Sequence, residues 1–220
     1  MKKRRRKKFK TFFVLFLVFC ALAMFQNYFQ KPISTPIDKN DPFSDVKKYS
    51  PLLQQELAKY HLESQTHVLV ALMQQESHGK GGDPMQASES AGLARNSITD
   101  PKQSIQVGVK HFQRVFTYGN QKKVDFPTII QAYNMGIGYV DYVAQHGGKH
   151  SEELAKQFSL LQVKKKPTLY TCGGNKNNFR YPYCYGDFTY STKVTKNIQL
   201  LADSIPVTGS GNEKPTSGSF

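Results

Sequence analysis

The stretch LMQQESHGKGGDPMQASES, residues 72–90, joins the end of a hydrophobic helix to a small, polar loop. One face of the helix is defined by residues at positions i, i+3, i+4 and i+7, which are Leu69, Leu72, Met73 and Glu76. A stripe of apolar side chains therefore ends in a carboxyl group. Burial and the negative end of the helix dipole both disfavour a carboxylate there. We expect the pKa of Glu76 to be raised toward neutrality, as a general acid requires.

Two polar segments are candidates to surround this acid. The glycines and small side chains that follow Glu76 suit a loop that approaches a ligand closely. Further on, QAYNMGIG, residues 131–138, places Tyr133 and Asn134 beside two glycines, and a flat ring and an amide can both contact a sugar. Simpler interpretations stay open: a solvated glutamate at a helix end, and a buried tyrosine beside a glycine that bends its helix.

Helical signals dominate the remainder of the central region and predict an all-α or mainly α domain. Capping residues and prolines mark helix starts, and glycines mark helix ends. The predicted helical stretches are 51–61, 66–77, 101–119, 126–148 and 191–204. A short hairpin around two cysteines is the one strand structure that the sequence leaves open.

The N-terminal end predicts export. Eight of the 30 basic residues lie within the first ten positions, and an apolar run without charges, residues 11–25, follows them. Its length lies between a signal-peptide core and a membrane-spanning helix, so a cleaved signal and an uncleaved anchor both stay open. In either case the basic cluster stays in the cytoplasm and the rest is exported. We expect a linker at 26–43, a folded domain at 44–204 and a disordered Gly/Ser/Pro-rich tail at 205–220.

The charge of the exported part is modest. The chain has a formal net charge of +14, but without the first ten residues 22 basic residues face 16 acidic ones. No basic helix or aromatic-basic motif follows, so nucleic acid is not an expected partner. A mildly basic body is compatible with acidic cell-surface polymers.

The cysteines predict a structural role. Cys172 and Cys184 lie 12 residues apart in a loop rich in Gly, Asn and Tyr, with no histidine spacing that would complete a zinc site. In an oxidising compartment a disulfide is the expected state. Cys20 is expected to be an apolar membrane residue, because bulky Phe19 precedes it where a lipoprotein site needs a small one.

Three short motifs together resemble the lysozyme-like, soluble lytic transglycosylase superfamily. They are Glu76-Ser77, Met85-Gln86 and Ala132-Tyr133-Asn134-x-Gly136, and the likeness extends over roughly residues 45–202. The segments DPMQASESAGL and ITDPKQSIQVGV are similar to its Gram-positive branch, found as the first domain of bifunctional cell-wall hydrolases of conjugative elements and in a pneumococcal vaccine antigen. The chain departs from the usual Gly-Leu-Met-Gln at residues 83–86. No Cys-His pair follows residue 204 that would suggest the peptidase domain of the bifunctional relatives.

The resemblance implies a goblet of about five to seven helices with a loop-rich cleft, in a Gram-positive bacterium. It also implies cleavage of the β-1,4 bond between N-acetylmuramic acid and N-acetylglucosamine in peptidoglycan, with Glu76 as the acid, Ser77 supporting it and no cofactor or metal. The substrate-binding residues expected from the motifs are Ser77, Met85, Gln86, Tyr133, Asn134 and Gly136.

The product is left open, because it depends on a second carboxylate. A retaining hydrolase needs one at about 5–5.5 Å from the acid and an inverting one at about 6.5–9.5 Å. The candidates are Asp83 and Glu89, while Asp100 fits a helix cap better. Without a second carboxylate, the sugar's own 6-hydroxyl would attack and leave a 1,6-anhydro end. A catalytically inactive peptidoglycan-binding module, tethered near a secretion or conjugation apparatus, is the alternative.

Overall fold

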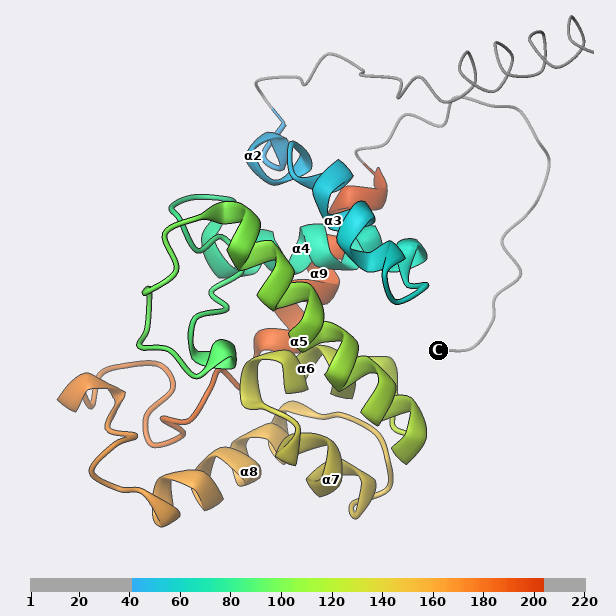
Figure 1. Cartoon of the computed structure of the whole chain (residues 1–220). Coiled ribbons are helices and arrows are strands. Elements are labelled where there is room, and N and C mark those ends of the chain that lie inside the picture. The colour runs from blue at the N-terminus through green and yellow to red at the C-terminus, as the bar shows by residue number, and fades with distance from the viewer. Residues whose placement is uncertain (1–40, 204–220) are drawn as a thin grey trace, which may run out of the picture. The chain divides into compact units, whose positions relative to one another are not determined.

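The computed structural model describes residues 41–203, and these residues form a helical domain without strands (Figure 1). The all-α expectation is confirmed, with eight α-helices in this part of the chain against the five to seven expected. The α-helices are α2 (Ser44–Lys47), α3 (Ser50–Ala58), α4 (Thr66–Ser77), α5 (Pro101–Lys122), α6 (Phe126–Met135), α7 (Gly138–Ala144), α8 (Glu152–Lys165) and α9 (Tyr190–Asp203).

Helix α4 is the central element of the domain. Every residue from Val68 to Met73 is buried, so the helix is hydrophobic around its whole circumference, as a helix inside a core must be. It packs against α9, α3 and α2. Helices α5 and α6 extend the core toward α7 and α8 (Figure 1).

The helix starts follow the capping chemistry of the sequence. Asp100 accepts hydrogen bonds from the backbone of Lys102 and Gln103 and opens α5, which continues to Lys122, three residues beyond its predicted end. Asp125 caps α6 in the same way through the backbone N–H of Thr128. These caps explain why the starts of both helices are readable from the sequence.

Three expectations differ from the structure. The predicted helix 126–148 is two helices, because Gly136 has φ 76° and ψ 171° and breaks the chain between α6 and α7. Helix α8 has no counterpart among the predictions. The segment around the two cysteines is an irregular loop with a short 3-10 turn, Cys172–Gly174, and not a hairpin.

The terminal predictions fall largely outside the described part of the chain, including the apolar segment 11–25 and the tail 205–220. Among residues 41–203, no helix is both long and apolar enough to cross a bilayer. Phe43, predicted to lie in the linker, is buried at 3 % exposure and packs with the core, so ordered structure begins before residue 44.

Candidate active site

Glu76 lies in the last turn of α4, where the apolar stripe ends. The side chains of Leu69, Leu72 and Met73 are fully buried, while Glu76 is half-buried with its carboxyl group enclosed by protein. The helix ends one residue later, because His78 adopts the left-handed conformation with φ 56°. The structure therefore places Glu76 on the buried face of the helix, as the spacing in the sequence predicts.

Tyr190, at the start of α9, donates a hydrogen bond of 2.5 Å from its hydroxyl to Oε1 of Glu76. Burial raises the pKa of Glu76 to about 7, and the nearby Asp83 and Asp187 act in the same direction. The Tyr190 hydrogen bond and the positive charge of Arg95 oppose this rise without cancelling it. A carboxyl group with this pKa retains a large share of its proton near neutral pH, which general acid catalysis needs.

The loop after α4 is tied back to the helix end by Ser77. Its hydroxyl donates to the carbonyl oxygen of Pro84 at 2.7 Å and accepts the backbone N–H of Gly79 at 3.0 Å. Ser77 therefore fixes the loop beside Glu76. This geometry gives the side chain a supporting position, since both of its hydrogen bonds are to the protein backbone.

Asp83 anchors the same loop from within. Its carboxylate accepts four hydrogen bonds, from the backbone N–H groups of Ala87 and Ser88 and from the hydroxyls of Ser88 and Ser104. Burial opposes the charged form, but these hydrogen bonds outweigh it and hold the pKa of Asp83 below its usual value. The side chain was a candidate second carboxylate, yet it is 4 % exposed and its oxygens accept from the loop and from Ser104 of α5.

Met85 and Gln86 have different environments. The Met85 side chain is fully buried in the core, so the structure does not place it where it could touch a substrate. Its backbone is the part that joins the site: the N–H donates to Ser104, and the carbonyl accepts from Tyr133. Gln86 is half-buried with φ 46°, and its amide nitrogen donates to the carbonyl of Asp83 at 3.1 Å.

Tyr133 and Asn134, at the end of α6, also divide into a buried and an accessible residue. Tyr133 is 7 % exposed; its hydroxyl donates to the Met85 carbonyl at 3.2 Å, and its ring meets that of His111 edge to face. Burial, with the charges of Glu76 and Asp83, raises the pKa of Tyr133 well above its usual value.

Asn134 is half-buried and accepts the backbone N–H of Asp187 on its Oδ1 at 2.7 Å. This fixes the amide orientation, and its nitrogen donates to no other residue in the described part of the chain.

The segment before α9 completes the surroundings of Glu76. Gln131, fully buried on α6, donates to the carbonyl of Asp187 at 2.7 Å and accepts the backbone N–H of Ser191 at 3.0 Å. These two hydrogen bonds hold the backbone on either side of Tyr190, and so they fix Tyr190 next to Glu76. The sequence analysis named neither Asp187 nor Tyr190 as a site residue. The one local signal was the turn before α9, where Asp187 accepts the N–H and the hydroxyl of Thr189 two residues later.

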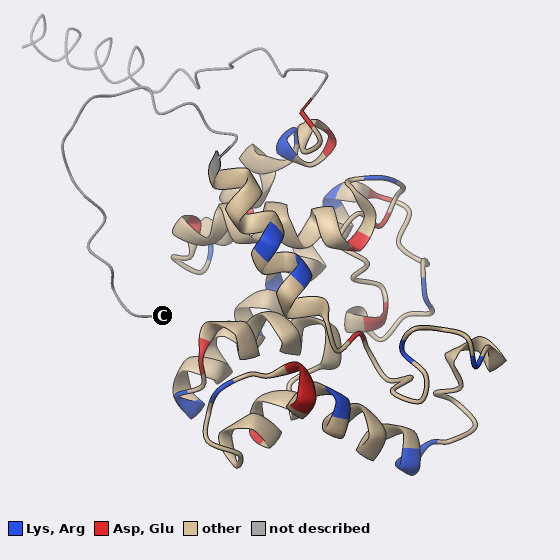
Figure 2. Ribbon diagram, turned by 180° about the vertical axis from the view of Figure 1, so that it is seen from behind, with Lys and Arg blue, Asp and Glu red and all other residues tan. Residues whose placement is uncertain are grey.

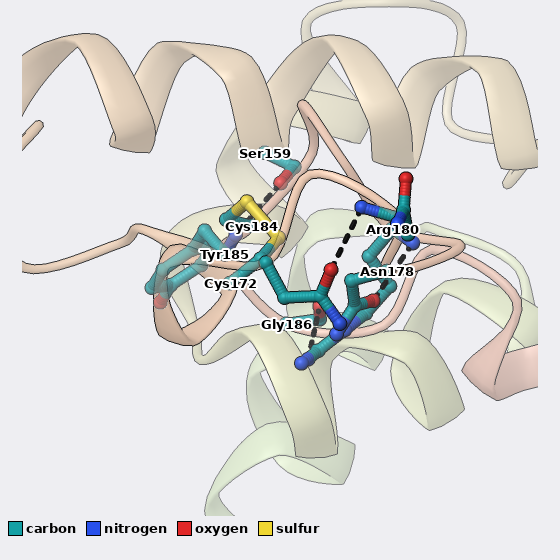
Figure 3. Close-up of a disulfide and its surroundings, with 9 residues drawn as sticks. Ser159, Cys172, Asn178, Arg180, Cys184, Tyr185 and Gly186 are labelled. Atoms are coloured by element: carbon teal, nitrogen blue, oxygen red, sulfur yellow. Dashed lines mark hydrogen bonds between the residues drawn. A yellow bond between two sulfur atoms is a disulfide. The ribbon is translucent and has the colours of Figure 1, made fainter.

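A disulfide joins Cys172 and Cys184 in the loop that leads to Asp187 (Figure 3). Next to it, the Tyr185 backbone N–H donates to the Ser159 hydroxyl at 3.0 Å, and the Arg180 guanidinium donates to the Gly186 carbonyl at 3.1 Å. These contacts attach the loop to α8 and fix its last residues. The disulfide therefore closes the loop whose last residues lead to Asp187 and Tyr190.

Glu89, the other candidate second carboxylate, is exposed on the 3-10 turn Glu89–Ala91. Lysines, arginines and acids are interspersed over several elements of the domain (Figure 2). Within residues 41–203, no group of three or more His, Cys, Asp or Glu side chains is arranged to hold a metal ion.

Comparison with known proteins identifies the family of the domain. The family model described as Lysozyme-like matches residues 43–198. The chain belongs to the lysozyme-like family. This lysozyme-like chain is 48% identical over 213 residues to the membrane protein YocA of Bacillus subtilis (strain 168), covering 94% of this chain and 95% of YocA.

Two further relatives carry names that state or suggest a role. The bifunctional muramidase/DL-endopeptidase CwlT of Bacillus subtilis (strain 168) is 43% identical over 167 residues, which cover 76% of this chain but 46% of CwlT. Pneumococcal vaccine antigen A of Streptococcus pneumoniae serotype 4 is 32% identical over 174 residues, covering 71% of this chain and 82% of that protein. The lysozyme-like chain thus spans about half the length of CwlT.

A solved structure is also similar. A Staphylococcus aureus protein described as similar to a lipoprotein of the NLP/P60 family superposes with a TM-score of 0.59 at 35% sequence identity. The match covers 70% of this lysozyme-like chain and 52% of the other.

Proposed function

We propose that this lysozyme-like domain cleaves the β-1,4 bond between N-acetylmuramic acid and N-acetylglucosamine in peptidoglycan, with Glu76 as the general acid. The observation that carries the proposal is an enclosed carboxyl group with a pKa of about 7, in a lysozyme-like fold. The 43% identity to a chain named as a muramidase supports the same reaction.

In this mechanism Glu76 donates its proton to the bridging oxygen as the bond to the anomeric carbon breaks. Such help contributes roughly 10²–10⁴-fold to the rate. The resulting carboxylate then accepts a proton, either from water, which gives a reducing end, or from the sugar's 6-hydroxyl, which gives a 1,6-anhydro end. Tyr190 orients Glu76 throughout, through the hydrogen bond to Oε1.

The other residues take substrate-positioning and supporting roles. Asn134 has an amide nitrogen without a partner among the described residues, so it is the group best placed to donate to a substrate carbonyl. Gln86 presents the oxygen of its amide, since the nitrogen is used by the loop. Ser77, Asp83, Met85 and Tyr133 act by fixing the loop, and Gly136 by ending α6.

We propose that the domain, residues 44–204, works on the outer side of the membrane of a Gram-positive bacterium. The basic cluster and apolar segment at residues 1–25 support a tether or an export signal, and the similarity to a protein named as a membrane protein extends over 94% of the chain. Its substrate is then the cell wall, with machinery for secretion or conjugation as a further partner.

The test is digestion of purified cell walls by the wild type and by Glu76→Gln, followed by mass spectrometry of the released fragments. Glu63→Gln is the control, because Glu63 is an exposed glutamate outside the site. We expect cleavage by the wild type and by the control, and a loss of at least 10²-fold in Glu76→Gln. Anhydro ends would identify a lytic transglycosylase, and reducing muramic ends a muramidase.

Equal cleavage by all three proteins would contradict the assignment of Glu76. Folded wild type that sediments with cell walls but releases no fragments would instead identify a binding module.

A further inference from the structure

The excess of positive charge beyond the first ten residues is concentrated in one stretch of the chain. Residues 154–186, which comprise most of α8 and the loop that precedes Asp187, contain six basic residues and no acidic one. Beyond the first ten residues the chain has 22 basic and 16 acidic side chains, so outside this stretch the two signs are equal in number. Figure 2 shows blue and no red along α8 after its first turn and along the loop that follows.

Four of these six cations are exposed and have no acidic partner. They are Lys164, Lys165, Lys166 and Lys176, and within residues 41–203 none of them forms an ion pair. The negative end of the α8 dipole favours Lys164 and Lys165, which lie in its last turn. The dipole does not account for Lys176 or for the absence of acids. Clustered like charges repel one another, so binding of an anionic partner stabilises this surface.

Exposed apolar side chains occur in the same stretch. Of the seven large hydrophobic side chains that are exposed within residues 41–203, four lie between residues 161 and 181: Leu161, Leu169, Phe179 and Tyr181, which are 42–62 % exposed. Exposed apolar surface rimmed by polar residues marks an interaction site. Flat aromatic rings pack against the apolar faces of sugar rings, and lysines pair with carboxylates. Residues 161–181, called the cationic segment below, thus present groups for both parts of an anionic glycan.

The cationic segment is held in one shape. The disulfide closes its loop, and Arg180 donates to the carbonyl of Gly186 (Figure 3). The ring of Phe179 packs against that of Phe188 with centroids 6.0 Å apart, and Nζ of Lys156 lies 5.0 Å from the centroid of Phe188. The two half-buried cations, Arg180 and Lys156, therefore stabilise the loop. The exposed groups are ordered before a ligand binds, which lowers the entropic cost of binding.

The cationic segment adjoins the Glu76 site along the chain. Six residues lead from Tyr181 to Asp187, and they span at most about 20 Å. The backbone of Asp187 is bonded to Asn134, and Tyr190, which follows it, donates to Glu76. A polymer of many sugar units that occupies the site is long enough to reach this segment as well.

The position of the segment in the domain separates the wall from the membrane as a partner. Helix α2, where the described chain begins, and the loop after α8 lie at opposite ends of the domain (Figure 1). A tether formed by residues 1–25 enters the domain at the α2 end. The opposite end then faces away from the point of attachment, which favours a wall polymer over lipid headgroups as the source of the anionic groups.

We propose that the cationic segment is a second binding surface for the peptidoglycan strand, outside the catalytic site. Its lysines pair with carboxylates of the peptides that the glycan carries, and Phe179 and Tyr181 pack against sugar rings. The inference rests on the proposed function, which supplies the polymer, and it concerns attachment to the wall and not cleavage of the bond. Attachment at this surface raises the effective concentration of the strand at Glu76.

The first test removes the four exposed charges from the full-length protein. The segment variant combines Lys164→Gln, Lys165→Gln, Lys166→Gln and Lys176→Gln. Its matched control loses four exposed lysines that also form no ion pair within residues 41–203, through Lys102→Gln, Lys110→Gln, Lys149→Gln and Lys196→Gln. Sedimentation with insoluble walls measures binding, and digestion of walls and of short soluble glycan fragments measures cleavage.

We expect the segment variant to bind walls about tenfold more weakly and to digest them more slowly, because it lacks four exposed ion pairs. Its cleavage of short fragments should equal that of the wild type, and the control should match the wild type throughout. Salt at about 1 M should weaken wall binding by the wild type to the level of the segment variant. Unchanged wall binding by the segment variant, or an equal loss in the control, would overturn the proposal.

A fluorescent reporter identifies the occupant directly. The chain has no tryptophan, so Phe179→Trp places a single one in the cationic segment. With the full-length protein in phosphatidylcholine vesicles, soluble peptidoglycan strands should shift its emission to shorter wavelength, because the indole loses contact with water. Leu200→Trp, at an exposed position of α9, is the control and should show no shift. Absence of a shift in Phe179→Trp would overturn the proposal. A shift in phosphatidylglycerol vesicles without strands would also overturn it, and would identify a lipid surface as the occupant.

The outcomes for the surface and for the reaction are separate. Glu76→Gln should bind walls as the wild type does, since Glu76 lies outside the cationic segment. A folded wild type that releases no fragments would contradict the proposed function, while a loss of wall binding confined to the segment variant would still support the second surface.

Discussion

The hydroxyl of Tyr190 donates a hydrogen bond to Oε1 of Glu76 across 114 residues of sequence. This contact joins the end of α4 to the start of α9, the two helices that pack together in the centre of the domain. Tyr190 is itself buried, and burial together with the charge of Glu76 raises its pKa well above the usual value. It is therefore a neutral donor near neutral pH, and its hydroxyl orients the Glu76 carboxyl group.

Replacing Tyr190 by phenylalanine should reduce cleavage of peptidoglycan by roughly ten- to hundredfold, because the acid loses its orienting contact. The hydrogen bond favours the charged form of Glu76, so its loss should also raise the pKa of that group further. The alkaline limb of the pH–rate profile, which marks loss of the Glu76 proton, should then move to higher pH. Rates measured from pH 4 to 9 check both effects.

Tyr142→Phe is the matched control for this change. The Tyr142 hydroxyl donates to Gln157, an exposed contact between α7 and α8. Removal of this hydroxyl should change neither the rate of peptidoglycan cleavage nor the alkaline limb of the pH–rate profile. A Tyr190→Phe profile that coincides with the wild type would show that the hydrogen bond does not act on the acid.

Glu76→Gln should make the protein more stable at high pH while it removes activity. The pKa of Glu76 is about 7 in the folded protein against 4.5 for the free group. Between these values the folded state holds a proton that the unfolded chain has released, so wild-type stability falls as pH rises through this window. Glutamine has no proton to lose. The free energy of unfolding of Glu76→Gln should exceed that of the wild type only slightly near pH 4 and by about 3 kcal/mol above pH 7.

Urea unfolding of both proteins at pH 4, 6 and 8 measures this difference. Titrating groups that the two proteins share cancel in the comparison. An equal difference at all three pH values would mean that Glu76 titrates normally.

The parts of the site that are local in sequence were predictable. The stripe from Leu69 to Glu76 set the buried face of α4, and the caps Asp100 and Asp125 start α5 and α6. The raised pKa of Glu76 was expected from burial, and burial is its largest cause in the structure.

The long-range contacts were not predictable by the same means. Nothing near Tyr190 in the sequence indicates that its hydroxyl meets a carboxyl group on α4, because that contact depends on how α9 packs. Asp83 shows the converse. In the sequence it is an acid in a polar loop, but two serines and two backbone N–H groups enclose it. The number of donors around a carboxylate, which separates a structural acid from an accessible one, is a property of the folded loop.

Asp83→Asn should destabilise the protein by roughly 3 kcal/mol, because an amide NH2 would then face donors that a carboxylate satisfied. The pKa of Asp83 is held below 3.8, so the wild type has this stabilisation above that pH and loses it as pH falls toward the folded value. Urea unfolding at pH 7 measures the loss. Asp45→Asn, at a residue in an exposed pair with Lys48, should change stability by less than about 1 kcal/mol. Equal effects of the two changes would show that the buried network around Asp83 adds nothing.

Gly108→Ala should impair both stability and activity, although alanine is the better helix former by about 1 kcal/mol. Gly108 lies in the middle of α5, where an added Cβ would be 2.7 Å from Cβ of Met85 and 3.0 Å from the hydroxyl of Tyr133. The methyl group must push the loop away from the helix, which breaks the contact between Met85 and Tyr133 and moves the residues next to Glu76.

Gly138→Ala is the matched control, because its Cβ would meet Phe158 at an ordinary 3.6 Å. Thermal unfolding and cell-wall digestion should show a loss of roughly 1–3 kcal/mol and reduced cleavage in Gly108→Ala, and little change in Gly138→Ala. Wild-type cleavage by Gly108→Ala would mean that the loop accommodates the methyl group, and that its close contact with α5 is not required to place the acid.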